Sequence, residues 1–285
     1  MKTLKKIFIA ALALSLFACT KNEETKTQST EQSAEPVLSG NVSTNGSTSM
    51  ASVIGALSES FMEKYPHVAI TYDPTGSGSG IASVDTGKAD IGLASRGLKQ
   101  GEKDSGLVAT TLALDGIAIV VNEKSTVNDL SLDTLNKIFT GEITNWSKVG
   151  GDNLEIACIG REAGSGTRDG FESITGTGGK CKLQSELTST GAVISSVANN
   201  KNAIGYASLS AVENQKGIKV LTIDGVTASE ATVKDGTYKI QRPFILVTKQ
   251  GKALSKVAQA FFDYATGGSS EVGELIKKAG AVPAK

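Results

Sequence analysis

The segment from Cys158 to Phe171, CIGREAGSGTRDGF, constrains the fold more strongly than any other part of the sequence. An apolar run at 154–159 leads into it, and a segment that can form a helix, 167–174, follows it. This order predicts a strand, a short glycine-bearing loop and a helix. Because a helix N-terminus carries about half a positive charge and leaves backbone N–H groups free, such a loop can bind an anion.

The residues of this loop suit an anion. Arg161 brings a planar guanidinium with parallel donors, which fits a carboxylate or a phosphate. Glu162 follows it and can hold the guanidinium in place. Ser165, Gly166 and Thr167 offer hydroxyls and a backbone that can approach a ligand closely. For this loop taken alone, a capped helix start beside a surface arginine stays open as an alternative.

Two further loops repeat the pattern. The sequence NGSTS places Ser47 and Thr48 in front of a helical pattern of apolar residues over 48–64. The sequence GSGSG places Ser77 in front of a short helical segment at 81–86. These glycines do not have the spacing of a dinucleotide-binding loop, and a flexible glycine turn is the alternative for the second of them. Three such loops in one chain favour a shared anion site.

The remaining segments alternate between strand and helix patterns. Strands are expected at 41–44, 68–72, 89–94, 108–114, 117–121, 203–206, 218–223 and 238–248, and helices at 132–139, 193–197, 254–265 and 272–279. Such alternation predicts an α/β architecture with open sheets, in which ligands bind at the carboxyl ends of strands.

The N-terminal segment has the features of an export signal. Three lysines precede a 12-residue apolar run at 7–18, which is too short to span a bilayer as a mature helix. We therefore expect a signal peptide at 1–18, ending in a sequence that resembles the bacterial lipobox. Cys19 would then carry the lipid and begin a disordered tether at 19–39, and a plain cleaved signal is the alternative.

The charge balance argues against nucleic acid as a partner. The chain has 29 Lys and Arg against 29 Asp and Glu. Without the three lysines of the signal, 26 basic residues face 29 acidic ones, a net of −3. Aromatic residues make up only 5%, too few for a base-stacking surface.

The sequence contains few candidate residues for catalysis or metal binding. His67 is the one histidine, so a Ser/His triad or a histidine-ligated metal site is nearly excluded. Ser165 has Ala163 where a nucleophile elbow needs glycine. The loop hydroxyls therefore read as hydrogen-bond donors in a protein that is not an enzyme, with no metal and no cofactor. A secreted phosphatase, and a surface adhesin or sensor, are the alternatives from other functional classes.

Two cysteines remain after the signal, Cys158 and Cys181. Export makes a disulfide chemically possible, and this one would close a loop of about 24 residues worth about 3 kcal/mol. Two buried thiols are the alternative, and a thiol count under denaturing conditions separates the two.

Several motifs together resemble the phosphate-binding proteins of bacterial phosphate ABC transporters, from about residue 40 to the end. The motifs that carry the resemblance, in the same order, are NGSTSM, GSGSGI, ADIGLASR, LDGIAIVVN, FTGEITNW, REAGSGTR and AIGY. REAGSGTR together with FTGEITNW is specific to these proteins.

The resemblance implies a two-lobed periplasmic-binding-protein fold of type II, with two open mixed sheets joined by two crossing hinge strands. The hinge strands correspond to 114–122 and 240–248. One lobe is then 40–116 together with 244–285, and the other is 117–243.

The resemblance also implies a function and a set of binding residues. The function is an exported, lipid-anchored and monomeric receptor that captures inorganic phosphate and hands it to the permease of an ABC transporter. Glu162 takes the place of the acid that braces the arginine. The phosphate-binding residues carried across by motif are Ser47, Thr48, Ser77, Arg161, Ser165, Gly166 and Thr167.

One position departs from the resemblance. Many members have an aspartate directly after the serine of the ASx segment, and it accepts the proton that phosphate retains. Here Arg96 follows Ser95. We expect Asp115 to be the acceptor, with a hinge or turn residue as the alternative, and Arg96 to add a positive contact or to be solvated. Asp115→Asn should then weaken phosphate binding far more than sulfate binding.

The missing aspartate keeps a second ligand class open. An unpaired buried donor costs about 1–3 kcal/mol, so a protonated ligand needs an acceptor whereas a fully deprotonated one does not. A receptor for sulfate, molybdate or tungstate is therefore the nearest alternative.

Overall fold

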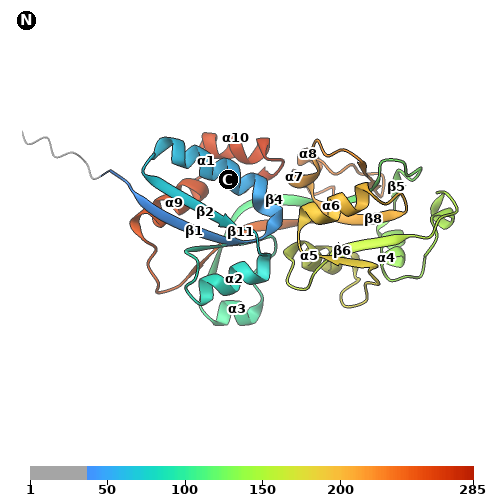
Figure 1. The fold of residues 1–285 in the computed structure, drawn as a ribbon, viewed down its shortest axis with the longest axis horizontal. Coiled ribbons are helices and arrows are strands. Elements are labelled where there is room, and N and C mark those ends of the chain that lie inside the picture. Colours follow the sequence, from blue (N-terminus) through green and yellow to red (C-terminus); the bar gives the residue numbers. More distant parts are fainter. Residues whose placement is uncertain (1–36) are drawn as a thin grey trace, which may run out of the picture. The chain divides into compact units, whose positions relative to one another are not determined.

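The long strand β4 (Leu107–Asn122) joins the two lobes of the protein. The computed structural model describes residues 37–285. The first half of β4 pairs antiparallel with β11 (Gln241–Lys249) and with β12 (Val282–Pro283). Its second half pairs antiparallel with β8 (Ala203–Ser208) and with β9 (Ile218–Val220). A single mixed path of strands, in the order β2-β1-β3-β11-β4-β8-β6-β7, therefore runs through both lobes (Figure 1).

The first lobe is built on three parallel strands. The strand β1 (Gly40–Gly46) lies between β2 (Val68–Asp73) and β3 (Ile91–Ala94), and β3 pairs antiparallel with β11. Its helices are η1 (Thr48–Met50), α1 (Ala51–Lys64), α2 (Ser77–Asp85), α3 (Gln100–Asp104), α9 (Lys256–Thr266) and α10 (Ser270–Lys278).

Both faces of this first sheet are buried. On β11, Phe244 and Leu246 pack with α1, α9 and α10, whereas Ile245 and Val247 pack with residues of α2. Successive side chains of a strand point to opposite faces, so the apolar run of β11 supplies two cores.

The second lobe repeats this arrangement. The strand β6 (Ala157–Arg161) lies between β7 (Ser185–Leu187) and β8, and pairs parallel with both. The remaining elements are α4 (Leu132–Phe139), η2 (Trp146–Val149), α5 (Gly166–Thr175), α6 (Thr190–Ala198), α7 (Leu209–Val212), α8 (Glu230–Lys234), β5 (Asp129–Leu130) and β10 (Thr222–Ile223). On β4, Ile117 and Ile119 face one core and Ala118 and Val120 face the other.

The hydrophobic clusters divide close to the predicted lobe limits. The clusters of the first lobe draw on 42–113 and 244–281, and those of the second draw on 117–240, with Val282 as an exception. The chain thus crosses between lobes in β4 and just before Phe244. Residues 37–285 also form one compact unit, so the exact limits stay a prediction.

Three sequence-based expectations change. The strands predicted at 108–114 and 117–121 are one continuous strand, because Asp115 and Gly116 pair with β11 and do not form a turn. The helix predicted at 81–86 begins earlier, at Ser77. The strand predicted at 218–223 divides into β9 and β10. The short elements α3, α7, α8, β5, β7 and β12 were not predicted.

Export features lie mostly beyond this description. The predicted signal at 1–18, the lipidation site Cys19 and most of the predicted tether fall outside the described residues. Within 37–285, no helix has the length and apolar character that crossing a membrane requires.

Candidate anion-binding site

The three glycine- and hydroxyl-bearing loops meet at one place. Ser47 Oγ donates to Ser95 Oγ over 2.9 Å, and Ser77 Oγ lies 3.3 Å from Ser95 Oγ. Gly166, from the other lobe, lies against both. A Cβ at Gly166 would come within 2.5 Å of Ser77 Oγ and 2.6 Å of Ser95 Oγ, so only glycine fits there. The junctions that follow β1 and β3 and begin α2 and α5 therefore converge.

Backbone and capping contacts fix these junctions. The amide of Gly78 in α2 donates to the carbonyl of Gly164 over 2.9 Å, which ties the two lobes together. Ser165 Oγ accepts from the amide of Arg168 over 3.3 Å and so caps α5. Since Ser165 caps its helix and is buried, the N-terminus of α5 is held beside Ser77 and Ser95.

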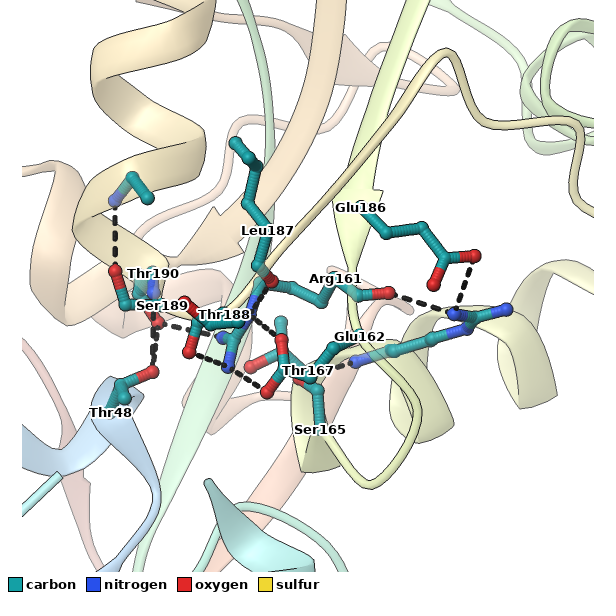
Figure 2. Close-up of polar contacts among 12 residues, drawn as sticks. Thr48, Arg161, Glu162, Ser165, Thr167, Glu186, Leu187, Thr188, Ser189 and Thr190 are labelled. Carbon is teal, nitrogen blue, oxygen red and sulfur yellow. Dashed lines mark hydrogen bonds and ion pairs between the residues drawn. The ribbon is translucent and has the colours of Figure 1, made fainter. Parts of the chain in front are cut away.

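A row of four hydroxyls continues the site across the gap between lobes. Thr48 and Thr190 are joined through their Oγ1 atoms over 3.1 Å, Thr190 lies 3.1 Å from Ser49 Oγ, and Ser49 lies 2.7 Å from Thr167 Oγ1. Figure 2 shows Thr48 reaching Thr190 from the opposite lobe. Four hydroxyl protons serve three contacts. At least one proton is therefore left to seek an acceptor outside the row.

Arg161 contacts the second hydroxyl of this row, that of Thr190. Its Nη1 donates to Thr190 Oγ1 over 3.2 Å, while Nε and Nη2 donate to the two carboxylate oxygens of Glu162 over 2.8 and 2.9 Å (Figure 2). The side chain is only 2% exposed. Because a guanidinium can only donate, Thr190 must accept from Arg161, and its own proton is directed elsewhere.

Tyr206 fixes the backbone of Arg161 through a hydrogen bond. Its Oη accepts from the backbone amide of Arg161 over 3.0 Å, and its ring stacks on Phe171 with centroids 4.2 Å apart. Burial raises the pKa of Tyr206, so the phenol stays neutral. The end of β6 is thus held rigidly where Arg161 leaves the sheet.

Arg242 contacts the last hydroxyl of the row, that of Thr167. Its Nη2 donates to Thr167 Oγ1 over 3.1 Å, and its Nη1 is paired with the carboxylate of Asp115. The antiparallel register sets this pair, because Arg242 on β11 lies directly opposite Asp115 on β4. Two buried guanidinium groups therefore donate to one row of hydroxyls.

Asp115 has protein donors on both carboxylate oxygens. Ser208 Oγ donates over 2.7 Å to Oδ2, which also accepts from Arg242, and the amide of Ser210 donates over 3.1 Å to Oδ1. Burial raises the pKa of Asp115, and its pairing with Arg242 opposes that shift. Asp115 thus accepts from two donors at Oδ2, one of them a guanidinium, and from one at Oδ1. Its contacts favour a role as counterion of Arg242, and its role as proton acceptor stays a prediction.

Arg96 turns away from the row. Its two terminal nitrogens donate to both oxygens of Glu102 over 2.8 and 2.7 Å, and its Nε lies 3.0 Å from Asp169 Oδ2 on α5. The residue is 7% exposed, so the expectation that it is solvated is wrong. The hydrogen bond from Arg96 holds the pKa of Glu102 below its ordinary value.

The comparisons with known proteins agree with this geometry. The PBP superfamily domain matches residues 24–269. The phosphate-binding protein PstS of Bacillus subtilis is 33% identical over 266 residues, which cover 92% of this chain and 88% of that protein. This chain belongs to the PstS family.

Two solved structures support the assignment to the PstS family. A Clostridium perfringens protein described as a phosphate ABC transporter substrate-binding protein, solved with bound phosphate, is 37% identical with a TM-score of 0.82. The match covers 86% of this chain and 100% of that one. An ABC-type phosphate transport receptor of Vibrio cholerae is 31% identical with a TM-score of 0.69, covering 85% and 99%. The predicted two-lobed fold of type II is confirmed.

Three contributors to the site of this PstS family member were missed in the sequence. Ser49 lies in the same loop as Ser47, and the sequence does not distinguish it from the neighbouring hydroxyls. Thr190 begins α6 after an unpredicted short strand, so a fourth strand–loop–helix unit was not counted. Arg242 gave no local signal, because only its pairing across the sheet brings it to the row.

Neither cysteines nor metal ligands add to the site. Cys158 and Cys181 are free thiols in the structure, so the disulfide alternative is not realised there. Burial raises the pKa of the Cys158 thiol to about 12, which keeps it protonated. In the described part of the chain, no group of three or more His, Cys, Asp or Glu side chains gathers to hold a metal.

Proposed function

We propose that this protein is an extracytoplasmic receptor that captures inorganic phosphate and delivers it to the permease of a phosphate ABC transporter. The observation that carries the proposal is the row of hydroxyls between two buried guanidinium groups, because the row retains a proton without an acceptor of its own. An anion oxygen is the acceptor that such a row lacks. Membership of the PstS family supports phosphate as that anion.

The proposed ligand contacts come from both lobes. Arg161 supplies the charge, and charge-assisted hydrogen bonds are roughly twice as strong as neutral ones. Glu162 holds the guanidinium, and Ser95 joins two of the serines. The remaining contacts are hydroxyls and helix N-termini, which bind an anion without a counter-charge. The proposed phosphate ligands are Ser47, Thr48, Ser77, Arg161, Ser165, Gly166 and Thr167.

Because these groups are buried, the proposed receptor must open to admit its ligand and then close on it. Ser47, Ser77, Ser165 and Thr167 are all buried in the conformation described here. A ligand from solvent reaches them only when the lobes separate, and closing then removes it from water. Among the described residues, the hydrogen-bond partners of the loop hydroxyls are other hydroxyls, backbone amides and Arg242, none of which is a general base, and we propose binding and release without chemistry on the ligand.

A receptor for a fully deprotonated oxyanion such as sulfate, molybdate or tungstate is the second candidate. The observation that favours it is the pairing of Asp115 with Arg242 and with two further protein donors, which makes this carboxylate the counterion of an arginine. Under the phosphate proposal, a serine or threonine oxygen, or the Oδ1 atom of Asp115, accepts that proton.

Calorimetry of the purified protein near neutral pH separates these candidates. Phosphate should bind and sulfate should compete weakly, since sulfate has no proton to donate to a hydroxyl oxygen. Tight sulfate binding without phosphate binding would replace the proposal with the second candidate. Turnover of a chromogenic phosphate ester would instead revive the phosphatase alternative.

We also propose that the protein is exported and held at the membrane by lipid on Cys19, as a monomer, with no cofactor and no nucleic-acid partner. The expected result of Cys19→Ala is release of the protein from the membrane fraction and loss of radiolabelled lipid. Retention in the membrane without lipid on position 19 would contradict this anchor.

A further inference from the structure

Arg242 is a buried charged group beside the site that the proposed ligand set does not include. It is 4% exposed and lies on β11, where the chain returns to the first lobe. Its side chain runs along α5, because a Cβ on Gly170 would come within 3.0 Å of Arg242 Cδ. Its guanidinium lies 5.3 Å from the centre of the Phe244 ring. The group is thus fixed in position beside the N-terminal turn of α5.

The guanidinium of Arg242 has more N–H donors than there are groups that accept from them. Nη1 is paired with Asp115 and lies 3.3 Å from the carbonyl of Gly116, and Nη2 donates to Thr167. Nε is buried and has no hydrogen-bond partner among the described residues. Buried charges normally have their donors satisfied, so a cation with one carboxylate and an unpaired donor suits a site that receives an anion.

The contact with Thr167 fixes the direction of one proton. A threonine hydroxyl has one proton and can accept two hydrogen bonds. Arg242 can only donate, so Thr167 must accept from it, and the hydroxyl proton then points to Ser49 or to a ligand. Arg161 imposes the same constraint on Thr190, the second hydroxyl of the row.

We propose that Arg242 is a positioning residue for the bound oxyanion. It directs the Thr167 hydroxyl proton into the site and adds a second positive charge, while Asp115 holds the guanidinium in place. This inference rests on the proposed function, since it names how that site selects a charged ligand. It assigns Asp115 to Arg242 and not to the ligand.

The decisive variant removes the pair together. Arg242→Met alone would leave Asp115 buried without its partner, and loss of stability would obscure the result. Replacing both members of a buried ion pair by neutral groups is often neutral for stability, and asparagine at 115 still accepts from Ser210. The double variant Arg242→Met with Asp115→Asn should therefore melt close to the wild type. Its phosphate Kd in calorimetry should rise about 10-fold.

Two single variants supply readouts that a purely structural role would not move. Asp115→Asn leaves the buried charge of Arg242 uncompensated, which should lower the melting temperature, whereas phosphate can supply the missing counter-charge and should bind as tightly as in the wild type or more tightly. Arg242→Lys keeps the charge and should recover part of the affinity lost in the double variant. A selective loss of phosphate over sulfate binding in Asp115→Asn would instead make Asp115 the proton acceptor and overturn the inference.

The outcomes separate this inference from the proposed function. If the wild type binds phosphate and the double variant binds it equally well, only the inference is wrong. If the wild type binds a different tetrahedral oxyanion, the same variants are measured with that anion. If the wild type binds none, both ideas fall. Should the double variant not fold, Thr167→Val leaves the ion pair intact and should show the same 10-fold loss, and unchanged affinity there would refute the inference.

Discussion

Two of the places where the lobes meet use the same pair of residue types for different purposes. At the hydroxyl row, Arg161 is paired with Glu162. At the second place, which we call the corner, Arg96 is paired with Glu102 through two equally short contacts and lies beside Asp169. Both arginines are buried. The third group decides the role: Arg161 meets a neutral hydroxyl, whereas Arg96 meets the carboxylate of Asp169 in the other lobe.

This difference indicates which of the two contacts, the hydroxyl row or the corner, depends on a ligand. The corner supplies its own counter-charges, from Glu102 and Asp169, and Lys99 adds a second cation 3.2 Å from Asp169. It can tie the lobes together with no ligand bound. The row has more hydrogen-bond donors than acceptors. A bound anion should therefore stabilise the closed conformation of the lobes mainly through the row. We expect salt to weaken the corner contact, which reaches partly exposed carboxylates, more than the buried row.

The largest expected effect comes from exchanging the two arginines for an apolar side chain of similar length. Arg161→Met should weaken phosphate binding at least about 100-fold, because losing one partner of a buried charged contact costs about 3 kcal/mol. Arg96→Met should weaken it far less, since Arg96 does not reach the row. Calorimetry on both variants measures the difference.

These two variants are matched controls for each other. Each removes a buried arginine from a glutamate partner, so their melting temperatures should fall by similar amounts. Equal losses of phosphate affinity would show that both places act only through stability, and the distinction between them would be lost.

A smaller effect is expected from removing one hydroxyl of the row. Thr190→Val keeps the shape but removes the contacts to Thr48, Ser49 and Arg161. Because a buried hydrogen bond contributes about 1 kcal/mol, phosphate affinity should fall about 5- to 10-fold in calorimetry.

Thr175→Val is the control for this hydroxyl. Thr175 is also buried, and its hydroxyl donates to the carbonyl of Phe171 over 2.7 Å within α5. This variant should lower the melting temperature and leave phosphate affinity unchanged. If Thr190→Val behaved in the same way, the row would be a packing feature and not part of a binding site.

The contrast between the row and the corner also marks the limit of prediction from sequence. Ser47, Ser77 and Ser165 were predictable because a strand, a glycine-bearing loop and a helix form a local pattern. The α/β architecture follows from the alternation of strands and helices, and the two-lobed fold is implied by the family resemblance. The side-chain partners did not follow, because they depend on segments far apart in the chain.

Two residues show why the partners were out of reach. Asp115-Gly116 has the composition of a turn, yet the antiparallel ladder with β11 keeps it extended and sets Arg242 against it. Arg96 occupies the place where an acid would face a phosphate ligand. Its side chain is drawn instead to Glu102, six positions on, and to Asp169 on another lobe.

A still smaller effect is expected at the corner itself. Asp169→Asn removes the carboxylate that joins the lobes, and a partly exposed ion pair contributes about 0.5–1 kcal/mol. Phosphate affinity should fall about 2- to 5-fold at low salt, with the difference from wild type disappearing at high salt. Calorimetry across a salt series measures this.

The control at a pair within one lobe is Asp133→Asn. Asp133 pairs with Lys137 over 2.8 Å on the exposed face of α4 and touches no residue of the other lobe through that pair. Its removal should leave phosphate affinity unchanged at every salt concentration. A salt-independent loss for Asp169→Asn would mean that the corner acts through packing and not through charge.

The smallest expected effect is the response of the corner to acid. The hydrogen bond from Arg96 holds the pKa of Glu102 below its ordinary value of about 4.3. The stability that this lowered pKa provides is therefore fully present above that ordinary value and is lost as the pH falls through the lower, folded-state value. Glu102→Gln should melt about 2 °C below the wild type at pH 6. This gap should close as the pH falls towards 3, because protonation then removes the same charge from the wild type.

The hydroxyl row has no carboxylate among its four members, so Thr190→Val should keep its difference from the wild type across the same range. A gap that stays constant for Glu102→Gln would place the contribution of Glu102 in its shape, and the electrostatic account of the corner would fail while that of the row stood.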